Sequence, residues 1–362
     1  MVLRQNSEVN MWGFAGAGSR IAISPDWCDS TFSAVCDSDG KWKAVVSTPA
    51  GSMMPHRVRI TETDFREASD SITLDNILIG EVWFCSGQSN MEMPLDGFWD
   101  CPVEGSAEEI ALSGKHDGIR MVSIPKTGAL SPQSTVGGFL WYQGETNVGR
   151  HDTYTARLQT LAAHWRGLWG QGELPFYLVE LAPYRYGESN DGNRKGGISG
   201  ALLREAQFEA ARSIPNSGIV CTNDLAYPYE DIQIHPCRKK EVGQRLAWLA
   251  LNRTYGFGSI DCEGPVFREM EIIGNEAVLR FDNDRNGFSP WHDLEGFEIA
   301  GEDRIFHKAE AYVVPGQKCV KVSSEAVDRP VAVRYCFRDF CPGNLTGSRN
   351  LPAFPFRTDD WQ

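Results

Sequence analysis

Between residues 77 and 262, short apolar segments alternate with amphipathic ones, and this alternation constrains the fold more than any other feature of the chain. Such alternation is typical of an α/β domain, in which helices cover a largely parallel sheet. The predicted strands are apolar runs bounded by polar or glycine residues: 77–85, 139–143, 175–182 and 218–224.

Two segments of this region have the periodicity of a helix. Residues 153–170 carry apolar side chains at steps of three or four, and Gly170 is a natural end for the helix. These apolar positions are Tyr154, Leu158, Leu161, Trp165 and Leu168. Residues 236–256 predict a second helix, with Pro236 in its first turn.

The segments on either side of the α/β region are rich in short strands. In residues 1–76, segments rich in Val, Ile and Trp are separated by Gly, Asp, Ser and Pro, which predicts a β-sandwich-like domain. The same pattern returns after Cys262. We therefore expect three domains: 1–76, 77–262 and 263–362.

Composition narrows the class of function. A net charge of −13 argues against a nucleic-acid partner, because phosphate binding needs clustered Lys and Arg. No apolar run approaches the ~20 residues that cross a membrane. The N-terminal residues lack the basic and apolar regions of a signal peptide. The ten cysteines show no zinc-ligand spacing, so no metal site is predicted.

Three polar segments follow predicted strands, and ligands gather where the carboxyl ends of strands meet. They are "GQSN" (87–90), "WYQGETN" (141–147) and "EDIQIHPCRKK" (230–240). Each also has an ordinary interpretation when taken alone. Ser89 suits a turn, 141–147 suits a helix-capping loop, and His235 suits a surface loop.

Together the three segments contain the parts of a serine hydrolase. Histidine accepts a serine proton near neutral pH, so His235 can activate Ser89. The Gln143 side chain can donate to a developing oxyanion. Cys85 is an alternative nucleophile, but it lies within an apolar strand, where we expect it to be buried packing.

The segments "GEVWFCSGQSNM", "LWYQGETN" and "IHPCRKKEVGQRLA" resemble the sialate O-acetylesterase family of the SGNH-hydrolase superfamily. "MVLRQNSEVNMWGFA" and "GNLTGSRNLPAFPFRTDDW" are similar to the β domains that flank its catalytic domain. The resemblance covers most of the chain and implies an SGNH-hydrolase-like (flavodoxin-like) parallel sheet. It also implies hydrolysis of O-acetyl esters on a carbohydrate, without metal or cofactor.

The resemblance implies a role for each polar residue. Ser89 would be the nucleophile and His235 the general base, with the Ser89 backbone N–H and Gln143 forming the oxyanion site. The expected substrate contacts are Asn90, Glu145 and Asn147.

The chain differs from the family at several places. Gln233 stands where many members carry an Asp two residues before the histidine, and Asp231 is our candidate substitute, ahead of Asp224 and Glu230. Only 53 residues separate Ser89 from Gln143, so we expect a shortened sheet domain that lacks a βα unit. In the family, that missing part supplies an oxyanion glycine, and we expect Gly137 or Gly138 to substitute for it, with Gly138 as our candidate. The chain also begins inside the family's first β domain.

Two hypotheses of function follow. The first is a serine esterase acting on O-acetylated sialic acid or other acetylated glycans. The second is a non-catalytic carbohydrate-binding or structural protein that kept the scaffold and lost part of the oxyanion site. The resemblance suggests a secreted, periplasmic or lysosomal protein.

Overall fold

The computed structural model describes residues 1–124, 132, 134–187 and 197–361. The chain forms two compact units. Unit 1 comprises Met1–Phe84, Ala111–Phe139 and His164–Leu174. Unit 2 comprises Cys85–Ile110, Leu140–Ala163 and Pro175–Gln362.

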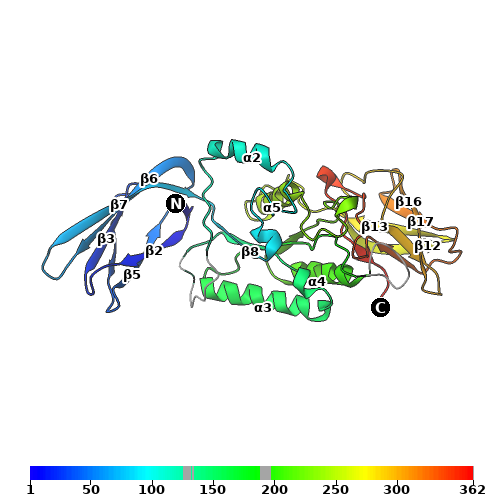
Figure 1. The fold of residues 1–362 in the computed structure, drawn as a ribbon, viewed down its shortest axis with the longest axis horizontal. Helices are drawn as coiled ribbons and strands as arrows, with labels where there is room; N and C mark the ends of the chain where they lie inside the picture. The colour runs from blue at the N-terminus through cyan, green and yellow to red at the C-terminus, as the bar shows by residue number, and fades with distance from the viewer. Residues whose placement is uncertain (125–131, 133, 188–196, 362) are drawn as a thin grey trace. The chain divides into compact units, whose positions relative to one another are not determined.

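Unit 1 is built on two antiparallel-rich sheets (Figure 1). The five-stranded sheet has the order β1 (Val2–Arg4), β7 (Ser69–Gly80), β6 (Ser52–Thr63), β3 (Arg20–Pro25) and β4 (Phe32–Val35). The second sheet pairs β2 (Glu8–Phe14) with β5 (Lys41–Ser47). In β5, Trp42, Ala44 and Val46 are buried while their neighbours are exposed, which is the alternation of a strand with one face on a core.

The apolar run 77–85 does not form one strand, as the sequence predicts, but two. Its first part ends β7, where Leu78, Ile79 and Gly80 pair with β1. Its second part enters β8 (Trp83–Gly87), which belongs to another sheet. Hydrophobicity alone does not locate this break, because both halves are apolar.

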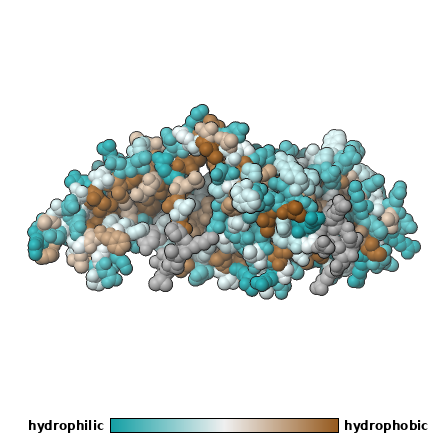
Figure 2. Space-filling view, viewed as in Figure 1, coloured by the Kyte–Doolittle hydropathy of each residue, from teal (hydrophilic) through white to brown (hydrophobic). Residues whose placement is uncertain are grey.

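Unit 1 exposes many large apolar side chains. Phe14 and Met53 are each 72% exposed, and Phe65 is 81% exposed. Apolar side chains lie among polar ones on the face drawn in Figure 2. The core of this unit therefore lies between its sheets, and the outer strand faces keep an apolar component.

The sheet that positions the candidate site has the order β11-β10-β9-β8. Its other strands are β9 (Gly138–Tyr142), β10 (Phe176–Val179) and β11 (Ser217–Val220), and β10 and β11 are parallel. The Gly137 N–H donates to Val82 O, and the Gln88 N–H donates to Tyr142 O. The residue numbers of the bonded positions thus increase in the same direction along both strands, so β8 and β9 are also parallel.

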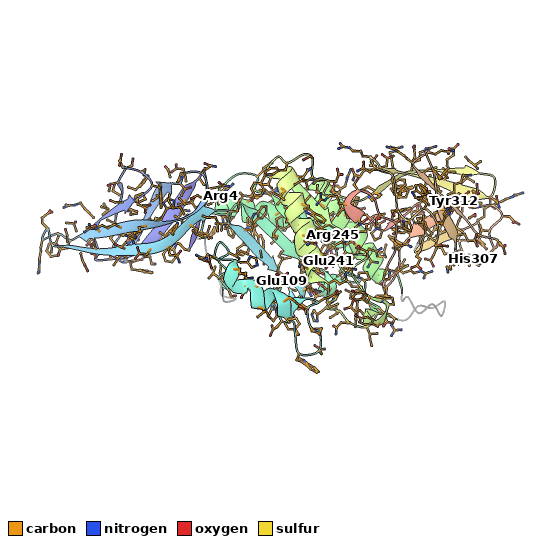
Figure 3. The ribbon with its side chains drawn as sticks, turned by 90° about the horizontal axis from the view of Figure 1, so that it is seen from above. Arg4, Glu109, Glu241, Arg245, His307 and Tyr312 are labelled. Atoms are coloured by element: carbon orange, nitrogen blue, oxygen red, sulfur yellow. The ribbon has the colours of Figure 1, made fainter. Side chains whose placement is uncertain are left out.

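Helices connect and flank these strands. They are α1 (Ser89–Glu92), α2 (Ser106–Leu112), α3 (His151–Trp169), α4 (Ser199–Ser213) and α5 (Lys239–Arg253). The helix predicted over 153–170 is confirmed as α3, whereas α4 was not predicted. Figure 3 labels Glu241 and Arg245 on α5. This helix begins at Lys239, so Pro236 precedes its first turn instead of lying in it.

The strand order does not confirm one detail of the expected fold. A flavodoxin-like sheet reverses its strand order next to the first strand. The order of the described strands instead follows the chain steadily from β8 to β11, and β8 lies at an edge. Cys85 on β8 is exposed, not buried as predicted, because an edge strand is less completely covered than an interior one.

The C-terminal part of unit 2 contains two four-stranded sheets. The first has the order β12 (Val266–Ile273), β13 (Glu276–Asp282), β17 (Cys319–Ser323) and β16 (Glu310–Val314). The second has the order β15 (Phe306–Lys308), β14 (Phe297–Ala300), β18 (Ala332–Tyr335) and β19 (Phe356–Arg357). Leu279, Val320 and Val333 are fully buried in one core shared by strands of both sheets.

The ten cysteines all lie in the described part of the chain and none of them forms a disulfide there, including Cys336 and Cys341. Within the described ranges, no helix combines the length and apolar character needed to cross a membrane.

A buried ion pair offers a test of the packing in unit 2. The Arg338 guanidinium donates to both Glu298 carboxylate oxygens, at 3.0 and 3.1 Å, and both side chains are 9% exposed. Arg338→Leu leaves the Glu298 carboxylate buried without its partner, which should cost about 3–5 kcal/mol of the free energy of unfolding. Urea denaturation followed by circular dichroism measures this loss.

The matched control is the double variant Glu298→Leu/Arg338→Leu, which removes both charges. It should recover most of the lost stability, since no unpaired charge remains. Equal losses in the single and double variants would contradict this explanation.

Candidate active site

Ser89 lies where β8 meets β9. β8 ends at Gly87, Gln88 donates its backbone N–H to Tyr142 O at 3.1 Å, and Ser89 begins the short helix α1. A Cβ atom on Gly87 would overlap the Tyr142 carbonyl oxygen. Glycine at this position therefore allows the close approach of the two strands immediately before the serine.

The structure brings Ser89 and His235 together across 146 positions of sequence. His235 Nε2 lies 2.9 Å from Ser89 Oγ, which is hydrogen-bond distance. The Phe98 ring packs against the imidazole with 5.0 Å between ring centroids. Burial lowers the pKa of His235, the positive charge of Lys239 lowers it further, and Asp100 opposes both effects. The imidazole is therefore held in its neutral form, which can accept a proton.

The other imidazole nitrogen does not contact any of the predicted acids. His235 Nδ1 lies 3.7 Å from the sulfur of Cys101, a buried residue that sequence reasoning did not identify. The Asp231 carboxylate instead lies 3.5 Å from the Arg185 guanidinium. We therefore withdraw Asp231 as the group that orients His235.

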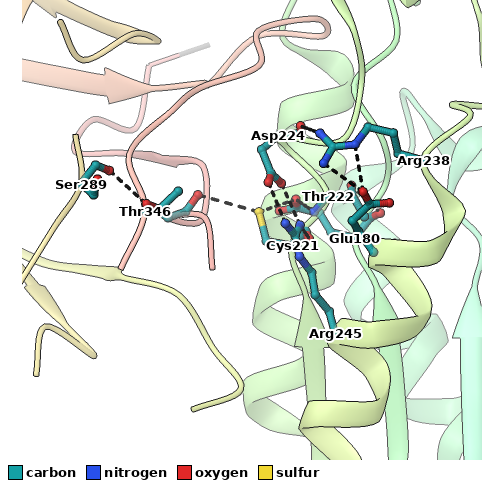
Figure 4. Close-up of polar contacts among 10 residues, drawn as sticks. Glu180, Cys221, Thr222, Asp224, Arg238, Arg245, Ser289 and Thr346 are labelled. Carbon is teal, nitrogen blue, oxygen red and sulfur yellow. Dashed lines mark hydrogen bonds and ion pairs between the residues drawn. The ribbon is translucent and has the colours of Figure 1, made fainter. Parts of the chain in front are cut away.

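The remaining candidates also have other partners. Asp224 receives two hydrogen bonds from Arg245, at 2.7 and 2.6 Å (Figure 4). The Glu230 carboxylate accepts the backbone N–H groups of Tyr227 and Cys237. The Gln233 side chain accepts the backbone N–H of His235, so it bonds to the main chain and not to the ring.

Asn90 connects the segment that carries Ser89 with the segment that carries His235. Its Nδ2 donates to Glu145 Oε1 through a short hydrogen bond and to Ile234 O at 3.1 Å. Its Oδ1 accepts from Lys239 Nζ at 2.5 Å. Asn90 and Glu145 are 5% and 8% exposed. The polar atoms of Asn90 are thus engaged inside the protein, and this geometry favours a structural role over the substrate contact that was predicted.

Gln143 follows the carboxyl end of β9 and lies beside Gln88. Its Nε2 donates to Gln88 Oε1 at 2.9 Å and to Asn147 Oδ1 at 2.8 Å. The Tyr154 hydroxyl donates to Gln143 O and Oε1, and burial raises the pKa of Tyr154 to about 12, so this donor stays protonated. The amide is therefore fixed in place, but it must exchange one partner before it can donate to an oxyanion.

Gly138 does not lie at the same end of the strand as Gln143. It is the first residue of β9, whereas Gln143 follows the last residue, Tyr142. A rise of about 3.3 Å per residue puts the two ends of this strand more than about 10 Å apart. The prediction of Gly138 as an oxyanion donor is therefore wrong on geometric grounds.

Comparisons with known proteins find similarity to carbohydrate esterases. A family model described as "Carbohydrate esterase, sialic acid-specific acetylesterase" matches residues 120–252. The crystal structure of a carbohydrate acetylesterase from Xanthomonas citri superposes with a TM-score of 0.76 at 26% identity, covering 99% of this chain and 97% of that one. The chain is therefore similar to carbohydrate esterases of the sialate O-acetylesterase family.

Curated members of this family align over part of their length. The sialate O-acetylesterase of Rattus norvegicus is 29% identical over 46% of this chain and 32% of that protein. The protein of Mus musculus is 28% identical over 61% of this chain and 44% of that protein. The chain therefore spans less than half the length of these two esterases. The family match at 120–252 includes Gln143 and His235, whereas Ser89 precedes it.

Two charged side chains beside the candidate site, Lys239 and Glu145, interact with each other. Burial lowers the pKa of Lys239 to about 8, and nearby Glu145 opposes this effect. Burial also raises the pKa of Glu145, against its hydrogen bonds and the charge of Lys239. Lys239 lies in the sequence run Arg238-Lys239-Lys240, and nothing in this run distinguishes the inward-facing Lys239 from Lys240.

In the described part of the chain, no group of three or more His, Cys, Asp or Glu side chains is arranged to hold a metal ion.

The Lys239 charge should be measurable at His235. In Lys239→Met the imidazole loses a nearby positive charge, so its pKa should rise relative to the wild type, which itself titrates below the usual value of about 6.5. Proton NMR titration of the histidine signals measures both values.

The control is Lys240→Met, since Lys240 is exposed and pairs with Glu109 at 2.7 Å. It should leave the His235 pKa unchanged. A His235 pKa that does not respond to Lys239→Met would show that the two groups do not interact.

Proposed function

We propose that the chain is a serine esterase that hydrolyses O-acetyl esters on carbohydrates, with O-acetylated sialic acid as the leading substrate. The observation that carries the proposal is the 2.9 Å contact between His235 Nε2 and Ser89 Oγ. The similarity to carbohydrate acetylesterases is the reason for proposing this substrate class. A serine hydroxyl is inert without a positioned base, and this contact provides one.

The geometry supports a two-step reaction. As Ser89 Oγ attacks the acetyl carbonyl carbon, His235 Nε2 takes the hydroxyl proton and the carbonyl oxygen becomes an oxyanion. Collapse of this intermediate breaks the bond to the sugar oxygen, which leaves with the proton from His235. A water molecule, deprotonated by His235, then attacks the acetyl-serine, and acetate leaves as Ser89 recovers its proton.

The oxyanion needs donors that are already in place. The Ser89 backbone N–H is at the start of α1, and the Gln143 Nε2 can be released from Gln88 or Asn147 when substrate enters. The loss of one such donor typically costs about 100-fold or more in kcat. Asn147 contacts substrate only indirectly in this scheme, through its hydrogen bond to Gln143.

An exposed aromatic side chain fits a sugar substrate. Trp99 is 96% exposed and directly follows Phe98, whose ring contacts His235. Indole rings offer a flat apolar face, which suits the apolar face of a pyranose.

The second candidate is a non-catalytic carbohydrate-binding or structural protein. The observation that favours it is the state of Gln143, whose Nε2 hydrogens both have partners within the protein. The shortened α/β region proposed from the sequence would also weaken an oxyanion site. An organophosphonate separates the two functions, because it labels only an activated serine and not a sugar-binding site.

Acetate release from O-acetylated sialic acid and from acetylated xylan tests the proposal. The wild type should release acetate, and Ser89→Ala should lose at least about 10³-fold in kcat because the nucleophile is gone. Ser86→Ala, which removes a hydroxyl from the preceding strand, is the matched control and should retain activity. A folded wild type that neither releases acetate nor reacts with the phosphonate would favour the non-catalytic function.

A further inference from the structure

A buried thiol occupies the position beside His235 where a serine hydrolase usually has an acid. Cys101 is 4% exposed, and its sulfur lies 3.7 Å from His235 Nδ1, on the side of the ring opposite the nitrogen that faces Ser89. The same sulfur lies 3.4 Å from Asp100 Oδ1. These contacts therefore form a continuous chain. It leads from the Asp100 carboxylate to the Cys101 thiol, then to the imidazole and then to the serine hydroxyl.

Each hydrogen in this chain of contacts can be assigned to a donor that faces an acceptor. A thiol is both a weak donor and a weak acceptor. Its S–H can donate to Asp100 while its sulfur accepts Nδ1–H from His235. Burial and then the Asp100 contact raise the pKa of the Cys101 thiol, so its proton is retained near neutral pH. With its hydrogen on Nδ1, the imidazole presents a bare Nε2 to Ser89.

The loop that carries Cys101 is built to hold it in this position. Phe98 and Cys101 exchange two backbone hydrogen bonds, at 3.2 and 3.1 Å. Gly97 has a φ of 87°, and a Cβ there would overlap the Cys101 carbonyl oxygen, so the tight turn requires glycine. The Phe98 ring packs on the imidazole itself.

The far end of the loop is bonded to the segment that carries the histidine. The Glu104 N–H donates to Cys237 O at 3.0 Å, and the Tyr227 hydroxyl donates to Glu104 Oε2 at 3.0 Å. Cys237 is two residues after His235. The loop and the histidine segment therefore form one hydrogen-bonded structure, which fixes the sulfur against Nδ1.

We propose that Cys101, supported by Asp100, is the positioning residue that orients His235 in place of a directly bonded carboxylate. The proposal rests on the proposed esterase function. Cys101 forms no covalent bond in this scheme. It fixes the ring orientation and the tautomer, and the Asp100 charge acts on the imidazolium through the thiol. The other nearby candidates, Asp231, Asp224 and Glu230, have the partners described above and do not compete for Nδ1.

Three variants test this role. Cys101→Ala removes the acceptor and should lower kcat by roughly 10- to 100-fold with little change in KM. This loss is smaller than the ~10⁴-fold loss in kcat that follows replacement of a triad carboxylate, because a thiol is a weak acceptor. Cys101→Ser keeps a donor and acceptor and should retain kcat within about fivefold of the wild type. Cys85→Ala, at an exposed thiol on β8, is the control and should change neither constant.

A spectroscopic measurement tests the same role without activity. Nitrogen NMR of histidine-labelled protein should find the His235 hydrogen on Nδ1 in the wild type and in Cys101→Ser. In Cys101→Ala it should find a mixture of the two tautomers. Asp100→Asn should lower the His235 pKa, because the imidazolium loses a nearby negative charge.

The outcomes separate this inference from the proposed function. If Cys101→Ala keeps full kcat and the Nδ1 tautomer, Cys101 does not orient His235, although the esterase stands. If the wild type releases no acetate and resists the phosphonate, the esterase fails, and the tautomer measurement still decides whether Cys101 orients the ring. If Cys101→Ala does not fold, the tautomer and kcat of Cys101→Ser and the His235 pKa of Asp100→Asn are the measurements that decide.

Discussion

The buried carboxamide of Asn90 is the interaction on which the candidate site depends. Asn90 directly follows Ser89, and it donates to the carbonyl of Ile234, which directly precedes His235. Consecutive Cα atoms are only 3.8 Å apart, so this bond fixes the nucleophile relative to its base. An unsatisfied buried polar group costs about 1–3 kcal/mol, and the Glu145 and Lys239 contacts satisfy the remaining atoms of the amide.

The sequence predicts which site residues lie close together, because the carboxyl ends of neighbouring parallel strands lie at the same edge of a sheet. Ser89 and Gln143 follow the neighbouring parallel strands β8 and β9, so their proximity is a consequence of the sheet. His235 is brought to Ser89 as its position before α5 suggested. These three positions could be identified from apolar runs that end in polar residues, together with the family resemblance.

The sequence does not predict the side-chain contacts around this pair. Asp231 is four residues from His235, yet its carboxylate faces Arg185, and the direction of a loop side chain has no sequence periodicity. Cys101 contacts His235 across 134 positions, and Gly97 is the only local sign of the tight turn that holds it. The sequence likewise does not distinguish Lys239, which faces inward, from its exposed neighbour Lys240.

The strand order affects how firmly the fold holds the residues of the candidate site in place. Ser89 follows β8, which lies at the edge of the sheet formed by the described strands, and the backbone groups of an edge strand have only one partner strand. Ile119, Met121 and Val122 are 64%, 93% and 84% exposed, which is unusual for adjacent apolar side chains. The hydrogen bonds of Asn90 and the Cys101 loop then have to maintain the geometry of the site.

The central claim is that Ser89 becomes acetylated during turnover, and acid-quench peptide mapping tests it most directly. The chain is mixed with O-acetylated sialic acid, quenched in acid within the first turnovers, digested and analysed by mass spectrometry. The account predicts one acetyl group on the peptide that contains Ser89, and none on that peptide in Ser89→Ala. Acetate release without acetyl-Ser89, or with the acetyl group on Cys85, would contradict it.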